Sequence, residues 1–172
     1  MKYLELDCLA GVAGDLGRIE ELIPGISLRL EVYSLKKTRE QKKISRSGKY
    51  TSYSAMIAEA LNLTFFGYEL AVHSQELRSV DEESAKSVLV SKLFTLGITK
   101  SYTEMVQWVD RVFVVIRESV GEESAILRVE KRTGPFEKCF WSECLAFYGK
   151  DMKRLLIFVV LYGNQAIHSP VL

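Results

Sequence analysis

The run Leu155-Leu-Ile-Phe-Val-Val-Leu-Tyr162 is the longest apolar stretch of the chain. It falls far short of the roughly 20 residues that a helix needs to cross a bilayer, so no membrane association is expected. A continuous apolar run of this length is typical of a strand that is buried on both faces of a sheet. A second run, Val112–Ile116, is rich in β-branched residues and predicts another strand of the same kind.

Working outward from this run, two segments alternate between apolar and polar residues and predict half-buried strands, Ile26–Leu35 and Ala125–Lys131. Tyr3–Asp7 and Phe65–His73 also have strand patterns. Helices are predicted over Leu16–Ile23, from Thr51 or Ser52 to Leu61, from Ser79 or Asp81 to Leu96, over Ser101–Val109 and over Phe136–Tyr148. Because helices and strands interleave, we expect an α/β or α+β fold with a mixed sheet of about five to seven strands.

Length and composition indicate one globular domain over residues 1–172. The net charge of +1 does not by itself predict binding to nucleic acid or to a membrane. Cys8, Cys139 and Cys144 are an odd number without a disulfide framework, and we recognise no signal peptide. A reducing, cytoplasmic location is therefore expected.

Two carboxylates and two glycines follow the N-terminal strand, at Asp7, Gly11, Gly14 and Asp15. Glycine lets the backbone approach a ligand closely, and the end of a strand holds a carboxylate in place. We therefore predict a glycine turn that binds a divalent cation, or a phosphate with its Mg²⁺. The alternative is that Asp15 only caps a helix starting at Leu16. The segment is neither a Walker A loop nor the three-glycine dinucleotide fingerprint.

The stretch Met1-Lys-Tyr-Leu-Glu-Leu-Asp-Cys-Leu-Ala-Gly-Val-Ala-Gly-Asp-Leu16 resembles the N-terminus of the nickel-insertion (nickel-pincer cofactor cyclometallase) family. That family begins with a strand followed by Asp-x-x-x-Gly-x-x-Gly-Asp-Met, which the two aspartates and two glycines match. Gly25–Lys37 and Thr51–Leu61 are similar to its next strand and helix. The resemblance implies a cofactor-biosynthesis protein that binds Mg or Ni, or nucleotide phosphates. A lysine- and arginine-rich stretch replaces the family's histidine-rich one.

Ser54–Leu61, Tyr68–Ser74 and Thr103–Val115 are similar in their order to elements of the low-molecular-weight tyrosine phosphatases. Those enzymes need a Cys-x5-Arg loop just before the first of these helices, because its N–H groups hold phosphate and lower the thiol pKa. No cysteine lies between Cys8 and Cys139. This resemblance therefore implies at most an inactive relative.

A strongly basic segment at residues 36–50 is expected to form a loop. Its cations stand against the single acid Glu40 and are Lys36, Lys37, Arg39, Lys42, Lys43, Arg46 and Lys49. With neighbouring tyrosines, they suit nucleic acid or an acidic protein as the partner. The other interpretation is a solvated, lysine-rich edge that blocks strand addition.

The sequence leaves two functions open, and it does not decide whether the chain is an enzyme. The first is a cofactor-biosynthesis protein that binds a divalent metal or a small anionic ligand at Asp7, Gly11, Gly14 and Asp15. The alternative is a non-catalytic binding or assembly protein that uses the basic segment. The two histidines and three cysteines have no zinc-site spacing, and no Ser-His-acid triad is evident.

Overall fold

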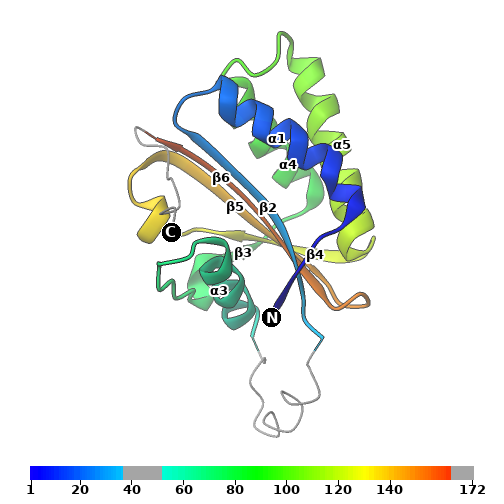
Figure 1. Ribbon diagram of the computed structural model, residues 1–172, viewed down its shortest axis with the longest axis vertical. Helices are drawn as coiled ribbons and strands as arrows, with labels where there is room; N and C mark the ends of the chain where they lie inside the picture. The colour runs from blue at the N-terminus through cyan, green and yellow to red at the C-terminus, as the bar shows by residue number, and fades with distance from the viewer. Residues whose placement is uncertain (37–51, 164–172) are drawn as a thin grey trace, which may run out of the picture.

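The computed structural model describes residues 1–36 and 52–163, which form a six-stranded sheet with helices on both faces (Figure 1). The strand order is β1-β2-β6-β5-β4-β3, and every neighbouring pair is antiparallel. The strands are β1 (Lys2–Leu4), β2 (Ile26–Ser34), β3 (Leu77–Ser79), β4 (Ser124–Val129), β5 (Cys139–Gly149) and β6 (Arg154–Gly163). Of the expected α/β or α+β class, the α+β form is confirmed, as is the predicted number of strands. The sheet is antiparallel throughout, in place of the mixed sheet that was expected.

Helices cover both faces of the sheet (Figure 1). One face packs against α1 (Ala10–Leu22), α4 (Glu82–Phe94) and α5 (Tyr102–Val120), and the other packs against α3 (Tyr53–Thr64). Short 3-10 helices lie at Asp7–Leu9, Ser74–Glu76 and Gly134–Phe136. The fold therefore has three layers, with one hydrophobic core on each side of the sheet.

The predicted buried strand is confirmed as β6, a central strand of the sheet. Alternate side chains of a strand point to opposite faces, so a strand between two cores must be apolar at successive positions. Burial of each leucine or phenylalanine side chain contributes about 1.5–3 kcal/mol. The side chains on the α1, α4 and α5 side are Leu156, Phe158 and Val160, and those on the α3 side are Leu155, Ile157, Val159 and Leu161.

Two of the predicted N-caps are confirmed. The Ser52 hydroxyl accepts the Ala55 N–H at 3.3 Å at the start of α3. The Asp81 carboxylate accepts the Ser84 N–H at 2.7 Å at the start of α4. Each cap satisfies a backbone N–H group that the first helical turn leaves without an intrahelical partner, which explains why both helices begin where they do.

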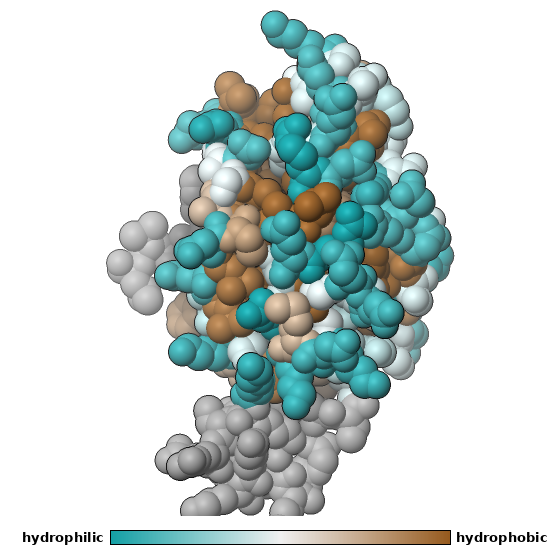
Figure 2. Space-filling model, turned by 90° about the vertical axis from the view of Figure 1, so that its right-hand side faces the viewer, coloured by the Kyte–Doolittle hydropathy of each residue, from teal (hydrophilic) through white to brown (hydrophobic). Residues whose placement is uncertain are grey.

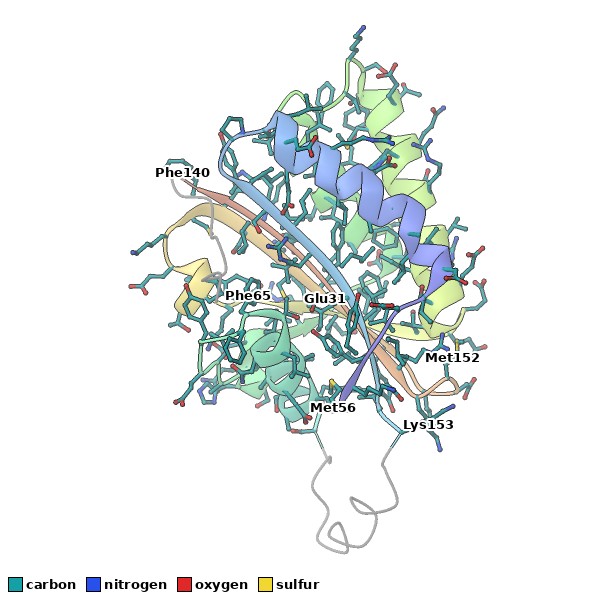
Figure 3. The ribbon with its side chains drawn as sticks, in the orientation of Figure 1. Glu31, Met56, Phe65, Phe140, Met152 and Lys153 are labelled. Atoms are coloured by element: carbon teal, nitrogen blue, oxygen red, sulfur yellow. The ribbon has the colours of Figure 1, made fainter. Side chains whose placement is uncertain are left out.

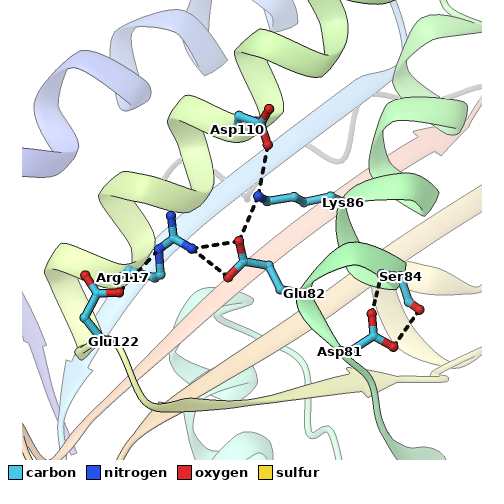
Figure 4. A network of polar contacts seen from close by, with 7 residues as sticks. All are labelled: Asp81, Glu82, Ser84, Lys86, Asp110, Arg117 and Glu122. Carbon is cyan, nitrogen blue, oxygen red and sulfur yellow. Dashed lines mark hydrogen bonds and ion pairs between the residues drawn. The ribbon is translucent and has the colours of Figure 1, made fainter.

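Charged side chains join α4 to α5 (Figure 4). The Glu82 carboxylate accepts hydrogen bonds from Arg117 at 2.9 and 3.0 Å and pairs with Lys86 at 2.8 Å. Lys86 also reaches Asp110 at 2.9 Å, and Arg117 lies 3.7 Å from Glu122. These side chains are partly exposed, so each pair contributes at most about 1 kcal/mol. Together they link the two helices on the solvent side of their contact.

The predicted strand at Val112–Ile116 is wrong, because this segment lies in the middle of α5. The predicted end of the preceding helix at Val109 is wrong for the same reason. β-branched residues lower helix propensity only slightly, and burial of one continuous face outweighs that preference. The buried residues follow a spacing of three and four and include Met105, Val109, Val112, Phe113, Ile116 and Val120.

The predicted helix over Phe136–Tyr148 is also wrong, because most of it forms β5. Residues 144–147 are all buried between the two cores, so this part has no polar face in either period. Phe65–His73 forms no strand and is held as a connection by Asn62. The Asn62 amide donates to the Leu70 carbonyl at 2.9 Å and accepts the Leu70 N–H at 2.6 Å.

The surface on the right-hand side of Figure 1 is largely hydrophilic, and polar side chains separate its hydrophobic areas (Figure 2). None of the helices in residues 1–36 and 52–163 has the length and apolar character of a membrane span. Large apolar side chains are exposed at Leu22, Phe66 and Phe140. Of these, Phe140 lines a pocket.

Candidate binding surface

The predicted glycine turn is helical. Asp7 opens the 3-10 helix Asp7–Leu9, and Gly11, Gly14 and Asp15 lie within α1. A Cβ atom at Gly11 or Gly14 would meet nothing within 4 Å, so neither glycine marks a close approach of the chain. The two aspartates are separated by roughly 12 Å along a helix axis with a rise of 1.5 Å per residue. At that separation they do not contact the same ion.

Asp15 takes part in the packing of α1. Its carboxylate accepts a hydrogen bond from the Trp108 indole at 3.3 Å and pairs with Arg18 at 3.3 Å. Asp7 is exposed. Within the two described ranges, no group of three or more His, Cys, Asp or Glu side chains is placed to hold a metal ion. The predicted nickel-binding and metal-binding roles are therefore contradicted.

Cys139 and Cys144 are not arranged as nucleophiles. Burial raises the pKa of the Cys139 and Cys144 thiols, so both are protonated at neutral pH. The Cys139 thiol donates to the Pro135 carbonyl at 3.3 Å, and Cys144 lies in the core on the α3 side. Cys8 is exposed, with its sulfur 3.4 Å from the Ser119 hydroxyl.

The basic segment connects β2 to α3. Among its predicted polyanion-binding residues, Lys36 lies in the described part of the chain and is exposed. Its role as a polyanion site stays a prediction. The other members of the set lie outside the described residues, namely Lys37, Arg39, Lys42, Lys43, Arg46 and Lys49.

An open pocket of about 670 Å³ lies at one end of the sheet. It is lined by the end of β4, the connection that follows and the first part of β5, at residues 128–132, 136–137 and 139–143. Phe140 marks this end in Figure 3, opposite the β5–β6 turn that carries Met152 and Lys153. Pockets of about 300–1,000 Å³ commonly hold small ligands, so the size suits a few side chains of a partner.

Glu143 is 3% exposed and is one of the residues that line the pocket. One of its oxygens accepts hydrogen bonds from Lys92 on α4 and from Arg128 on β4, each at 2.8 Å. Its other oxygen lies 2.6 Å from Arg128 Nε, so Arg128 holds the carboxylate with two N–H groups. The side chains of Lys92 and Arg128 remain 26% and 32% exposed. One buried negative charge is thus held by two partly exposed positive charges.

An aromatic cluster lies beside Lys92 and consists of Phe140, Trp141 and Tyr162. A β-bulge between Cys139 and Trp141 leaves Phe140 without a partner in β6, and its side chain is 64% exposed. The Tyr162 ring centre lies 5.8 Å from that of Phe140 and 5.9 Å from that of Trp141. Lys92 Nζ is 5.2 Å from the Trp141 ring centre, within the range of a cation–π contact.

Lys131, on the wall of the pocket, is buried and neutralised by Glu76. Its ammonium lies 3.0 and 3.3 Å from the two Glu76 oxygens. Burial by itself would raise the pKa of Glu76, but the His73 N–H and the Lys131 ammonium outweigh it and hold that pKa below its usual value. The neighbouring Arg132 is exposed and has no ionic partner in the part of the chain that the structure describes.

Comparison with known proteins identifies the fold of this chain. No protein-family model matches the chain. Two uncharacterised proteins of Encephalitozoon cuniculi (strain GB-M1) are each 26% identical to it over 160 residues, which cover 91% of this chain and 95% of theirs. Two crystal structures of citrus MAF1 superpose with TM-scores of 0.65 and 0.64 at 18% and 20% identity. The matches cover 88% and 87% of this chain and 99% of each MAF1 chain. The chain has the fold of MAF1.

The MAF1 fold corrects the family resemblance drawn from the first sixteen residues. The match extends over 88% of the chain, whereas the nickel-insertion resemblance is confined to its N-terminal part. The residues that carried that resemblance form β1 and the helical stretch that includes α1. A resemblance in two aspartates and two glycines does not outweigh a match of the whole architecture.

Proposed function

We propose that this chain is a non-catalytic binding or assembly protein whose partner is a protein with an acidic surface. The observation that best supports the proposal is the MAF1-like fold over 88% of the chain. The competing function, in cofactor biosynthesis, depended on metal or phosphate binding at a glycine turn. That segment is helical and the described residues hold no metal-binding cluster, so the metal-binding part of the competing function loses its support. Phosphate binding at Asp7, Gly11, Gly14 and Asp15 stays a prediction.

The buried polar side chains of the described residues all have partners, and this arrangement also favours a binding role. Every buried side-chain nitrogen or oxygen of the described residues has a hydrogen-bond partner. Glu76, Glu82 and Glu143 are each held by one or two cations. Catalysis by proton transfer needs a group that can release its partner and reach a substrate. Groups fixed in this way instead hold a surface in one shape.

The basic segment would also attract an acidic partner. Its cations at residues 36–49 would raise the rate of association with an acidic partner through long-range electrostatic attraction, which salt screens. Nucleic acid is the alternative partner for the same cations. The two partners differ in their sensitivity to nuclease.

The test is retention of a partner from an extract of the source cells on the immobilised full-length chain, with and without nuclease. We expect a protein that stays bound after nuclease treatment and is released progressively as salt is raised. A variant with Lys42→Gln and Lys43→Gln should retain less of it. The matched control replaces the exposed cations Lys100 and Arg111 with glutamine and should retain as much as the wild type.

Loss of all bound material on nuclease treatment would overturn the protein partner in favour of nucleic acid. Failure to retain any macromolecule at low salt would contradict the proposed binding function itself.

A further inference from the structure

The strand β3 lies at one edge of the sheet and turns backbone groups away from it. Glu76 and Val80 bond to the β4 side, through the Glu76 carbonyl at 2.8 Å and the Val80 N–H at 3.1 Å. Because bonded residues alternate along an antiparallel ladder, Arg78 also faces β4, and the backbone groups of Leu77 and Ser79 point outward. Within residues 1–36 and 52–163, the Ser79 N–H and C=O and the Leu77 C=O have no hydrogen-bond partner.

A second open pocket, of about 660 Å³, lies beside this edge on the α3 side of the sheet. Leu77 and Leu127 contribute apolar surface to it from β3 and β4. Tyr53 and Tyr148 add two aromatic rings, which pack edge to face with their centres 5.3 Å apart. The pocket lies at the end of α3 that Met56 marks in Figure 3. No charged side chain is among the described residues that line it, so the pocket suits an apolar or aromatic side chain.

The geometry of a sheet links the unpaired edge to the pocket. An antiparallel strand added to β3 would bond to the Ser79 N–H and C=O through a single residue of its own, directly opposite Ser79. Residues opposite each other in a sheet project their side chains from the same face. Because Ser79 lines the pocket, the side chain of that opposing residue would enter it.

We infer that β3 and this pocket bind an extended segment of a protein partner, which adds a strand to the sheet and places an apolar or aromatic side chain in the pocket. Main-chain bonds to the edge would give affinity, and the pocket would give selectivity. The inference rests on the proposed function, because it names a surface through which the binding protein holds its partner. It assigns this contact to folded, uncharged groups rather than to the basic segment.

A second copy of the chain fits this edge less well than a segment of another protein. The pairing that uses the outward groups of both copies places Leu77 of one copy opposite Ser79 of the other, and Arg78 opposite Arg78. The two arginines would form a non-hydrogen-bonded pair, in which side chains are closest, and like charges directly opposite destabilise a sheet. A short, charged edge strand also limits non-specific pairing. The bound segment must therefore gain affinity from the pocket as well as from the edge.

The backbone contact is tested by fluorescence-polarisation titration of the full-length chain with a labelled peptide of about seven residues, in which valine and threonine flank a central phenylalanine. Ser79→Pro removes the outward N–H and no bond of the β4 ladder, so circular dichroism should show an intact fold. Peptide binding should weaken by about tenfold or more. Ser79→Ala keeps the N–H and is the matched control, with a change of less than about twofold.

A modified peptide tests the same contact on the wild-type chain. N-methylation of its central phenylalanine removes the N–H that would donate to the Ser79 carbonyl. Binding should weaken by about tenfold, and this result does not depend on the folding of any variant.

The pocket is tested by Tyr53→Ala, which should weaken binding of the unmodified peptide by about fivefold. Replacement of the peptide's phenylalanine with alanine should weaken it at least as much. The matched control is Tyr102→Ala. Tyr102, like Tyr53, is an exposed first residue of a helix after a serine N-cap, and it lies outside the pocket. It should change the affinity by less than about twofold.

Three results would overturn the inference. They are binding that neither Ser79→Pro nor N-methylation weakens, absence of peptide binding up to about 1 mM, and a dimer of the chain that Ser79→Pro dissociates. The proposed function fails separately. If a nuclease-resistant protein partner is retained equally by wild-type and Ser79→Pro chains, the binding role stands and this edge is not its site.

Discussion

Replacement of Gly149 with alanine is expected to lower the free energy of unfolding by about 3 kcal/mol or more. Gly149 ends β5 and pairs with Ser124 and Arg154 in the neighbouring strands. A Cβ atom there would overlap the Val120 carbonyl oxygen and lie 2.7 Å from the carbonyl carbon. Because Val120 is the last residue of α5, the overlap is backbone against backbone, and relief requires the helix to move away from the sheet.

The control is the same substitution at Gly14. This glycine lies within α1, and a Cβ atom would meet nothing within 4 Å. Alanine there should raise the free energy of unfolding by about 0.5–1 kcal/mol, because glycine loses more backbone freedom in a helix. Urea denaturation followed by circular dichroism measures both changes. A loss of stability at Gly14, or a loss of less than about 1 kcal/mol at Gly149, would contradict the packing described here.

Replacement of Glu143 with alanine is expected to lower the free energy of unfolding by about 2–3 kcal/mol. The substitution removes a buried carboxylate and leaves Lys92 and Arg128 beside each other without their shared partner. Breaking a fully buried ion pair costs about 3–5 kcal/mol, and we expect less because water reaches both cations. The loss should be visible in the same urea titration.

Glu130→Ala is the matched control for Glu143. Glu130 pairs with Arg78 across exposed positions, so its removal should change the free energy of unfolding by less than about 0.5 kcal/mol. Equal effects at the two positions would show that the Glu143 cluster contributes no more than an ordinary surface pair.

Elements with a single clear signal were predictable from the sequence. The apolar run Leu155–Tyr162 was recognised as a buried strand, β6, because it is short and includes β-branched and aromatic residues. Ser52 and Asp81 marked two helix starts because their side chains satisfy free backbone N–H groups. The alternation in Ile26–Leu35 identified β2, the strand beside β6.

The wrong secondary-structure predictions fall on segments in which two physical preferences compete. Val112–Ile116 has the composition of a strand, but long-range burial of a helical stripe prevails over local propensity in α5. Within Phe136–Tyr148, residues 144–147 are apolar on both faces, and pairing with β4 and β6 decides the structure of the segment. Gly11 and Gly14 suggested a turn, yet isolated glycines are tolerated in a helix that buries Val12, Leu16 and Ile19.

The ion cluster around Glu143 was not found from the sequence because its residues come from separate elements. Lys92, Arg128 and Glu143 belong to α4, β4 and β5 and meet only through the fold. A local signal did exist, since an acidic residue inside the apolar stretch at residues 139–149 required a cationic partner somewhere in the chain. The identity of that partner could not be read without knowing the strand order.

The most direct test of the proposed function, a non-catalytic binding protein with an acidic protein partner, is retention of a partner by the immobilised full-length chain with and without nuclease. We expect the wild-type chain and its Gly14→Ala variant to retain a protein that stays bound after nuclease treatment and is released as salt is raised. A wild-type chain that retains no macromolecule at low salt would contradict the proposal.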